Sequence, residues 1–183
     1  MKDIVRVPLL LALVLIGCSS IKVDSDYDPG ANFAALRKYA WLPLPRAKTG
    51  DPRLDSPLLA SRIEDAVETR LAFKGFTEVE PDDADFFVTF HIGVDQKLDV
   101  MTIPTTYGYG YGARRGYYGG VDTRVDQYEQ GTLLIDFIDR NKADLLWRGS
   151  GQSRVSQTSS PEEREQRVRE AVNAILKQFP PEP

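Results

Sequence analysis

A strict alternation of apolar residues near the middle of the chain constrains the fold most. Phe86, Val88, Phe90, Ile92 and Val94 are apolar at every second position, with threonine, histidine and glycine among the residues between them. Successive side chains of a strand point to opposite faces, so this period of two predicts a strand with one face in a core and a wetter outer face. The apolar pattern extends toward residue 103. The rest of the chain must therefore supply neighbours for a long strand.

Four shorter segments also predict strands. The last two are joined by residues 139–142, whose Asp-Arg-Asn-Lys sequence suits a hairpin turn. Between the first two, Phe33 and Leu36 predict one short helical turn. In chain order the four segments are residues 21–27, 39–42, 132–138 and 145–147.

Two segments carry apolar stripes at helical spacing. The first starts at Ser56-Pro57, and Gly75 suits the position just past its end, so we predict a helix over residues 57–74. The second starts at Ser160, where proline at the first helical position is combined with a capping box, and Pro180 stops it. The stripes are Leu59, Ile63, Ala66, Val67 and Leu71 in the first helix, and Val168, Ala171, Val172, Ile175, Leu176 and Phe179 in the second.

The order of these elements predicts an α+β fold. We expect an antiparallel sheet of about four to five strands with two helices packed on one face. A long hairpin should carry a flexible Tyr/Gly-rich loop over residues 104–120. Residues 18–183 are expected to form a single periplasmic domain, a length that suits one hydrophobic core.

The amino terminus predicts a lipid anchor. The apolar run from Val7 to Ile16 would rise only about 15 Å as a helix, half of a bilayer's hydrocarbon core, so residues 1–17 are interpreted as a signal peptide. The run ends in Leu15-Ile16-Gly17-Cys18, which resembles the bacterial lipobox. That resemblance implies a diacylglycerol on the Cys18 thiol and an acyl chain on the new amino terminus. The alternative is an accidental cysteine after an ordinary signal.

Two neighbouring features refine this expectation. Cys18 is the only cysteine, so no disulfide framework accounts for it. It is followed by Ser19 and Ser20 rather than by an aspartate, which in lipoproteins of this kind permits transfer to the outer membrane. We therefore expect the periplasmic face of the outer membrane, with the membrane contacted through the lipid anchor.

Three groups of residues occur in an order that resembles a known family. They are Tyr27-Asp28-Pro29 with Phe33 and Tyr39-Ala40-Trp41; then Lys74-Gly75-Phe76 with Ala84-Asp85-Phe86; and finally Gly131-Thr132-Leu133, Ile135-Asp136 and Leu146-Trp147-Arg148-Gly149. Together with the lipobox, they resemble the bacterial lipoproteins of the domain of unknown function 4136 family. The resemblance implies an envelope lipoprotein with an α+β fold. It implies no established activity and no catalytic residues.

The most distinctive surface candidate is the Tyr/Gly-rich segment. Residues 107–120 contain five tyrosines and six glycines, and tyrosine offers a flat apolar face with a polar tip. Such a segment could contact an envelope protein, a glycan or a membrane interface. The alternative is a disordered hairpin tip without a ligand. The candidate contact residues are Tyr107, Tyr109, Tyr111, Arg114, Arg115, Tyr117 and Tyr118.

Residues for catalysis or cofactor binding are sparse. His91 is the only histidine, whereas metal sites usually need several converging ligands, so no metal is expected. Asp136 and Asp139 are three apart, which places them on opposite faces of a strand. No Gly-x-Ser-x-Gly elbow occurs, and Gly149-Ser150-Gly151 is the nearest approach. We therefore predict no catalytic residues, no enzyme and no cofactor beyond the lipid on Cys18.

Charge excludes one further class. The net charge is −4, and removing residues 1–17 with their two cations and one aspartate leaves −5 (−4 − 1), which argues against nucleic acid as a partner. The leading hypothesis is a lipid-anchored, non-catalytic binding or assembly module. One alternative is an envelope hydrolase acting on peptidoglycan or glycans. The other is a structural lipoprotein with no fixed ligand.

Overall fold

A six-stranded sheet forms the centre of the protein in this computed structural model, which describes residues 21–46, 48–105, 120–155 and 159–181. The strand order across the sheet is β1-β6-β5-β4-β2-β3. The strands are β1 (Lys22–Tyr27), β2 (Lys38–Trp41), β3 (Thr77–Glu78), β4 (Phe86–Thr105), β5 (Gly120–Asp139) and β6 (Leu145–Arg154). The α-helices are α1 (Pro57–Phe73) and α2 (Pro161–Leu176), and 3-10 turns occupy Phe33–Ala35 and Pro81–Asp83.

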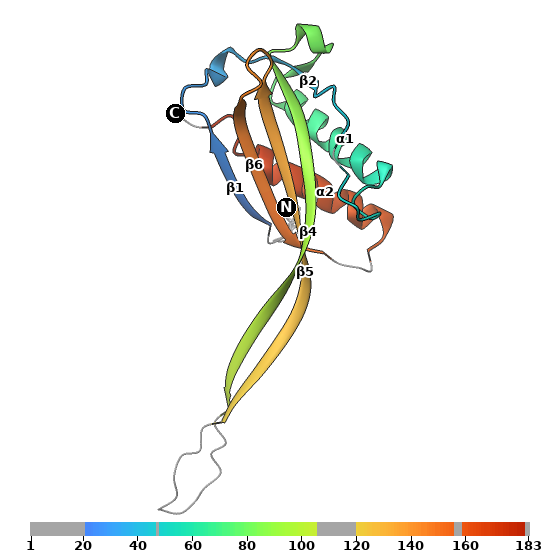
Figure 1. The fold of residues 1–183 in the computed structure, drawn as a ribbon, viewed down its shortest axis with the longest axis vertical. Helices are drawn as coiled ribbons and strands as arrows, with labels where there is room; N and C mark the ends of the chain where they lie inside the picture. Colours follow the sequence, from blue (N-terminus) through green and yellow to red (C-terminus); the bar gives the residue numbers. More distant parts are fainter. Residues whose placement is uncertain (1–20, 47, 106–119, 156–158, 182–183) are drawn as a thin grey trace, which may run out of the picture.

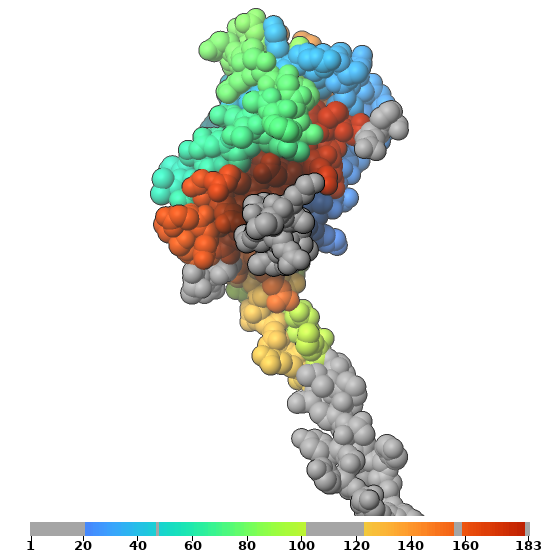
Figure 2. Space-filling view, turned by 180° about the vertical axis from the view of Figure 1, so that it is seen from behind, coloured from blue at the N-terminus to red at the C-terminus, as the bar shows by residue number. Residues whose placement is uncertain are grey.

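Both helices lie on the same face of the sheet (Figures 1 and 2). Their apolar stripes contact the alternate residues of β4, β5 and β6, as the two sequence periods predict. The fully buried centre includes Phe86, Val88, Ile135, Phe137, Trp147, Val172, Ile175 and Leu176. The opposite face of the sheet has no helix over it among the described residues.

Both helix starts, and the glycine that follows α1, are where the sequence places them. Ser160 and Glu163 form the predicted capping box at the start of α2. After α1, Gly75 has a φ of 85° and its N–H donates to Ala72, while the N–H of Phe76 donates to Leu71. These two bonds form a Schellman motif, which satisfies carbonyls at the helix end and needs a residue that tolerates positive φ.

The expected antiparallel sheet of four to five strands was wrong in both number and direction. β2 runs parallel to β4 on one side and to β3 on the other, so the sheet is mixed and has six strands. The physical reason is the crossover through α1, which carries the chain back to the end of the sheet where β2 began. β3 escaped prediction because Thr77 and Glu78 are only two exposed residues.

Several boundaries also differ from expectation. β5 begins at Gly120 rather than residue 132, and β6 continues to Arg154. Helix α2 ends at Leu176, so Phe179 lies beyond the helix that it was expected to belong to. Phe179 is nevertheless fully buried, with its ring centroid 4.4 Å from that of Phe137.

The hairpin of β4 and β5 continues well beyond the domain, as expected for a long hairpin. We call the arm the part from the pair Gln96↔Glu129 to the pair Thr105↔Gly120. Figure 1 shows it as a twisted two-stranded ribbon that projects from one end of the sheet. In the described part of the chain, no helix is long and apolar enough to cross a membrane.

Candidate functional site

A buried carboxylate lies on the sheet face opposite the helices. Asp136 in β5 is only 3% exposed, although its face of the sheet has no helix over it. The Arg148 guanidinium donates to both carboxylate oxygens, Nε to Oδ1 at 2.7 Å and Nη2 to Oδ2 at 2.6 Å. The strand register explains this geometry, since Arg148 of β6 lies directly across from Asp136. The hydrogen bond from Arg148 to Asp136 raises the pKa of Arg148 above its ordinary value, against the opposing effect of burial.

His91 completes this cluster. Its Nε2 lies 3.5 Å from Asp136 Oδ2, and its side chain is 51% exposed. The sequence predicted an outward-facing strand histidine, which is confirmed, but it did not predict the nearby carboxylate. Two charged or polar partners thus satisfy a carboxylate that would otherwise be costly to bury.

The geometry of this cluster bears on the hydrolase alternative. A histidine beside a buried carboxylate is half of a catalytic triad. Ser150 is on the same face, but Leu134 lies between it and His91 in the strand register. The two backbones are two strand spacings apart, roughly 9–10 Å. The Ser150 hydroxyl donates to the backbone carbonyl of Asp24 at 3.4 Å, and no hydrogen bond joins it to His91 among the described residues. Ser150 and His91 are therefore not paired as nucleophile and base in this conformation.

Asp139 has a separate, structural role. Its Oδ1 accepts hydrogen bonds from the backbone N–H groups of Asn141 and Lys142, both at 2.8 Å, and so closes the β5–β6 turn. Asp136 and Asp139 thus do not form a pair of catalytic carboxylates. Among the described residues, no group of three His, Cys, Asp or Glu side chains is arranged to hold a metal ion.

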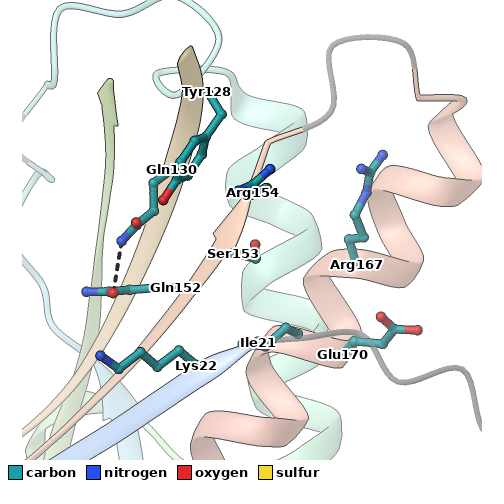
Figure 3. Close-up of a pocket in the computed structure, with 9 residues that line it drawn as sticks. All are labelled: Ile21, Lys22, Tyr128, Gln130, Gln152, Ser153, Arg154, Arg167 and Glu170. Carbon is teal, nitrogen blue, oxygen red and sulfur yellow. Dashed lines mark hydrogen bonds between the residues drawn. The ribbon is translucent and has the colours of Figure 1, made fainter. Parts of the chain in front are cut away.

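A hollow of about 360 Å³ lies at the base of the arm (Figure 3). Arg154 of β6 stacks over the Tyr128 ring at 4.0 Å and pairs with Asp99 of the arm at 2.7 Å. Arg167 and Glu170 line the hollow from α2, and Lys22, Gln130, Gln152, Ser153 and Ile21 complete the lining. With Asp99, which pairs with Arg154, three cations and two carboxylates surround the hollow, so its positive excess is small.

A second hollow, of about 420 Å³, lies beside β4 where β2 has ended. Phe90, His91 and Ile92 form its strand side, and the loop between β2 and α1 forms the other. The Arg46 guanidinium of this loop lies 4.3 Å from the centre of the Phe90 ring. Neither hollow was predicted, because each is lined by residues far apart in the sequence.

The arm exposes apolar side chains to solvent. Among the arm residues whose side chains the structure describes, four apolar ones are more than half exposed: Leu98 (67%), Val100 (59%), Met101 (58%) and Val125 (56%). Val100 and Val125 are directly opposite one another across the two strands. A two-stranded ribbon is marginally stable alone in water, and exposed apolar side chains of this kind mark a contact surface.

The contact residues predicted from sequence, Tyr107 to Tyr118, lie outside the described residues. Cys18 and residues 1–17, the predicted signal peptide, also lie outside them. The structure instead places exposed apolar residues on the strands that lead to the Tyr/Gly-rich segment. The alternation of the strand pattern beyond Val94 was the available signal, but it was interpreted as core.

The protein is thus a two-layer α+β domain with a mixed sheet and a projecting arm. A family model, described as "Domain of unknown function (DUF4136)", matches residues 23–181. The chain therefore belongs to the domain of unknown function 4136 family, as the sequence resemblance indicated. No protein among the curated sequences matches it.

Several solved structures are similar to this chain at low sequence identity. A PDZ domain protein from Parabacteroides distasonis ATCC 8503 superposes with a TM-score of 0.55 and 14% identity over 89% of this chain. The match spans only 37% of that protein, so the likeness concerns the fold alone. PelC dodecamers from Paraburkholderia phytofirmans, in two crystal forms, give TM-scores of 0.47 and 0.45 at 11% identity. They are matched over 85% of this chain and over 94% and 95% of their own.

Proposed function

We propose that this protein is a lipid-anchored envelope lipoprotein at the outer membrane whose periplasmic domain is a non-catalytic binding or assembly module. The arm carries this proposal, because it exposes apolar side chains on a ribbon that stands clear of the core. The lipobox at Cys18 supports the location. The partner would be another envelope component, a protein or a glycan.

The strand register supports a link between the anchor and the arm. Lys22, at the start of β1, lies level with Gln152, Thr132 and Gly93, which is the end of the sheet from which the arm projects. Cys18 stands three residues before Ile21, so a lipid there could be at most about 11 Å from Ile21. The strand from Gly93 to Thr105 extends about 40 Å at ordinary strand rise. An anchored domain would therefore carry its arm close to the membrane.

The satisfied state of the buried cluster supports a non-catalytic role. Arg148 donates short hydrogen bonds to both oxygens of Asp136, whereas His91 Nε2 is 3.5 Å away, so the carboxylate is held by Arg148 more closely than by His91. Replacing His91 with alanine tests the hydrolase alternative. A peptidoglycan- or glycan-cleaving activity of the purified protein that disappears in His91→Ala would overturn the non-catalytic proposal.

Crosslinking in intact cells, followed by mass spectrometry, tests the binding role. Val125→Asp places a charge on the exposed apolar side of the arm, and Leu58→Asp is the matched control because Leu58 is 68% exposed on α1. We expect Val125→Asp to lose envelope crosslinks that the wild type and Leu58→Asp retain. Equal crosslinks in all three proteins would contradict the role of the arm. A Cys18→Ser variant that still fractionates with the outer membrane and still incorporates labelled palmitate would contradict the anchor.

A further inference from the structure

One edge of β4 lacks a partner strand over most of its length. β5 pairs with β4 along its whole extent, but on the other side β2 covers only Phe86 to Val88. From Phe90 to Thr105, no described strand occupies this edge. Long exposed edges are templates for pairing with another chain, and natural proteins usually block them with charged side chains, bulges or proline. Between Phe90 and Val100 this edge has no bulge and no proline, and its charged residues are Asp95, Lys97 and Asp99.

The direction of the unpaired backbone groups follows from one hydrogen bond. The N–H of Leu42 donates to the carbonyl of Val88 at 2.9 Å, so Val88 directs its backbone groups toward the β2 side. Backbone groups alternate sides along a strand. The even-numbered residues from Phe90 onward therefore direct their N–H and C=O groups toward the free edge. Among described residues, no backbone hydrogen bond from outside the sheet reaches these groups between Phe90 and Val100.

We propose that a second copy of this chain pairs with this edge, β4 against β4, as an antiparallel two-fold dimer centred on Gln96. In this register Gln96 of one protomer faces Gln96 of its partner, and even residues meet even residues, as the backbone hydrogen bonds require. The result is a continuous sheet through both protomers, in which the β4 part of each arm pairs with residues 90–96 in the body of the partner's β4. This inference goes beyond the proposed function, since it leaves the β5 edge of each arm open to another envelope component.

Charge complementarity selects the register. Centred on Gln96, Asp95 of each protomer faces Lys97 of its partner, which gives two opposite-charge pairs across the new strand junction. Neither side chain has an ion-pair partner within the described part of one chain. Centring on Lys97 or on Asp95 instead brings like charges together, which is unfavourable in directly opposed pairs. Centring on Leu98 would oppose Lys97 to Asp99, which Arg154 already holds at 2.7 Å.

The apolar residues of the same edge match in this register. Leu98 of one protomer faces Val94 of its partner, and Val100 faces Ile92. Leu98 and Val100 are two of the most exposed apolar residues of the arm, so the pairing covers the surface that the monomer leaves open. All four residues lie on one face of the strand, because side chains alternate.

The second hollow lies where the partner's strand would arrive. In this register residues 100–102 of the partner come beside Ile92, His91 and Phe90, which line that hollow. The space of about 420 Å³ between β4 and the loop before α1 leaves room there for an added strand. The pairing ends before Val88, where β2 takes over the edge.

Charge reversal with rescue tests the pairing. The full chain, purified in detergent, is compared by sedimentation equilibrium at several detergent-to-protein ratios as wild type, Asp95→Lys, Lys97→Asp and the double swap. Each single reversal creates two like-charge pairs, so we expect dimerisation at least about tenfold weaker, and recovery in the double swap. The control is Arg124→Asp, which reverses a 70% exposed side chain on β5, outside the proposed junction. A monomeric wild type, single reversals no weaker than the control, or absent recovery would each overturn the dimer.

Disulfide trapping tests the register itself. Hydrogen-bonded antiparallel partners have Cα atoms about 5.5 Å apart, within reach of a disulfide. Gln96→Cys should therefore form a covalent dimer faster than Gln127→Cys, a residue of β5 whose side-chain amide donates to Gln96 within one protomer. The wild-type chain, with Cys18 alone, supplies the baseline. Equal trapping of the two variants would refute the register. Sedimentation equilibrium and disulfide trapping both measure self-association of the purified chain. Their failure is therefore distinguishable from a failure of the cellular crosslinking that tests the proposed function.

Discussion

The pair of Arg148 and Asp136 allows the sharpest stability prediction. Arg148→Met keeps the length and apolar stem of the side chain but leaves Asp136 buried with only His91 nearby, at 3.5 Å. Removing one partner of a fully buried ion pair costs about 3–5 kcal/mol. Because the Arg148 side chain is 45% exposed, water can reach the vacated position, so we expect the lower end, about 3 kcal/mol.

The matched variants separate the charge effect from packing. Asp136→Leu leaves only a half-exposed arginine and should cost about 1 kcal/mol, since that guanidinium can be hydrated. Replacing both residues leaves no buried charge and should cost no more than about 1 kcal/mol, so the two changes should show a coupling of at least about 3 kcal/mol. His91→Ala should cost less than about 1 kcal/mol, because its contact is long and half exposed.

Urea unfolding followed by tryptophan fluorescence measures these differences, because Trp147 is fully buried and Trp41 packs against the core. The midpoint shifts are converted with a common slope, provided that the slope is unchanged. Two results would refute the argument that Arg148 compensates the buried charge of Asp136. One is an Arg148→Met variant whose free energy of unfolding lies within about 1 kcal/mol of wild type, and the other is additive effects of Arg148→Met and Asp136→Leu.

Three further perturbations are predicted from packing and titration. Gly149→Ala places a Cβ 2.5 Å from Ile175 Cγ2, so the free energy of unfolding should fall by about 1–3 kcal/mol. Gly93→Ala is the control, because its Cβ would have no atom within 4 Å and should change the free energy of unfolding little. Equal effects of the two variants in urea unfolding would contradict this packing. Burial raises the pKa of Asp85, but the hydrogen bonds it accepts from two backbone N–H groups before and at the start of β2 outweigh this and hold that pKa below its ordinary value. The ionised Asp85 carboxylate therefore stabilises the fold above a pH of about 4, and this stabilisation is lost as the pH falls. Asp85→Ala should lower the free energy of unfolding by about 1–2 kcal/mol at pH 7 and by less at pH 3. A cost that does not change with pH would refute this prediction. Burial, with nearby carboxylates, raises the pKa of the Tyr39 phenol, so wild-type stability should decline above pH of about 10 more steeply than that of Tyr39→Phe; parallel declines would refute it.

The elements themselves were largely predictable from local patterns. The alternation at Phe86, the capping box at Ser160 and the glycine after α1 each depend on residues within a few positions of one another. Such signals act through backbone geometry and short-range hydrogen bonds, so they are expressed whatever the rest of the chain does. The family resemblance was also predictable, because its residues follow one another in a recognisable order, and the match over residues 23–181 bears it out.

The site was predictable only in part. Sequence placed Asp136 and His91 on the outer face of their strands, but nothing local indicated that they lie 3.5 Å apart or that Arg148 covers the carboxylate. That proximity depends on the register of β4 against β5 and of β5 against β6. Register is a property of pairs of strands, and a shift of one residue would move each side chain to the opposite face.

By itself, the sequence determined both helices and where they begin, the longer strands in outline, and which face of β4 is apolar. Only the tertiary structure decided that β2 runs parallel to β4, that the sheet has six strands, and that β4 and β5 continue together beyond the other strands into the arm. The physical reason is that side-chain alternation reports the faces of a strand and is silent about its edges. Whether an apolar residue such as Leu98 is buried in the core or exposed on the arm depends on which strands occupy those edges, and that is decided by long-range packing.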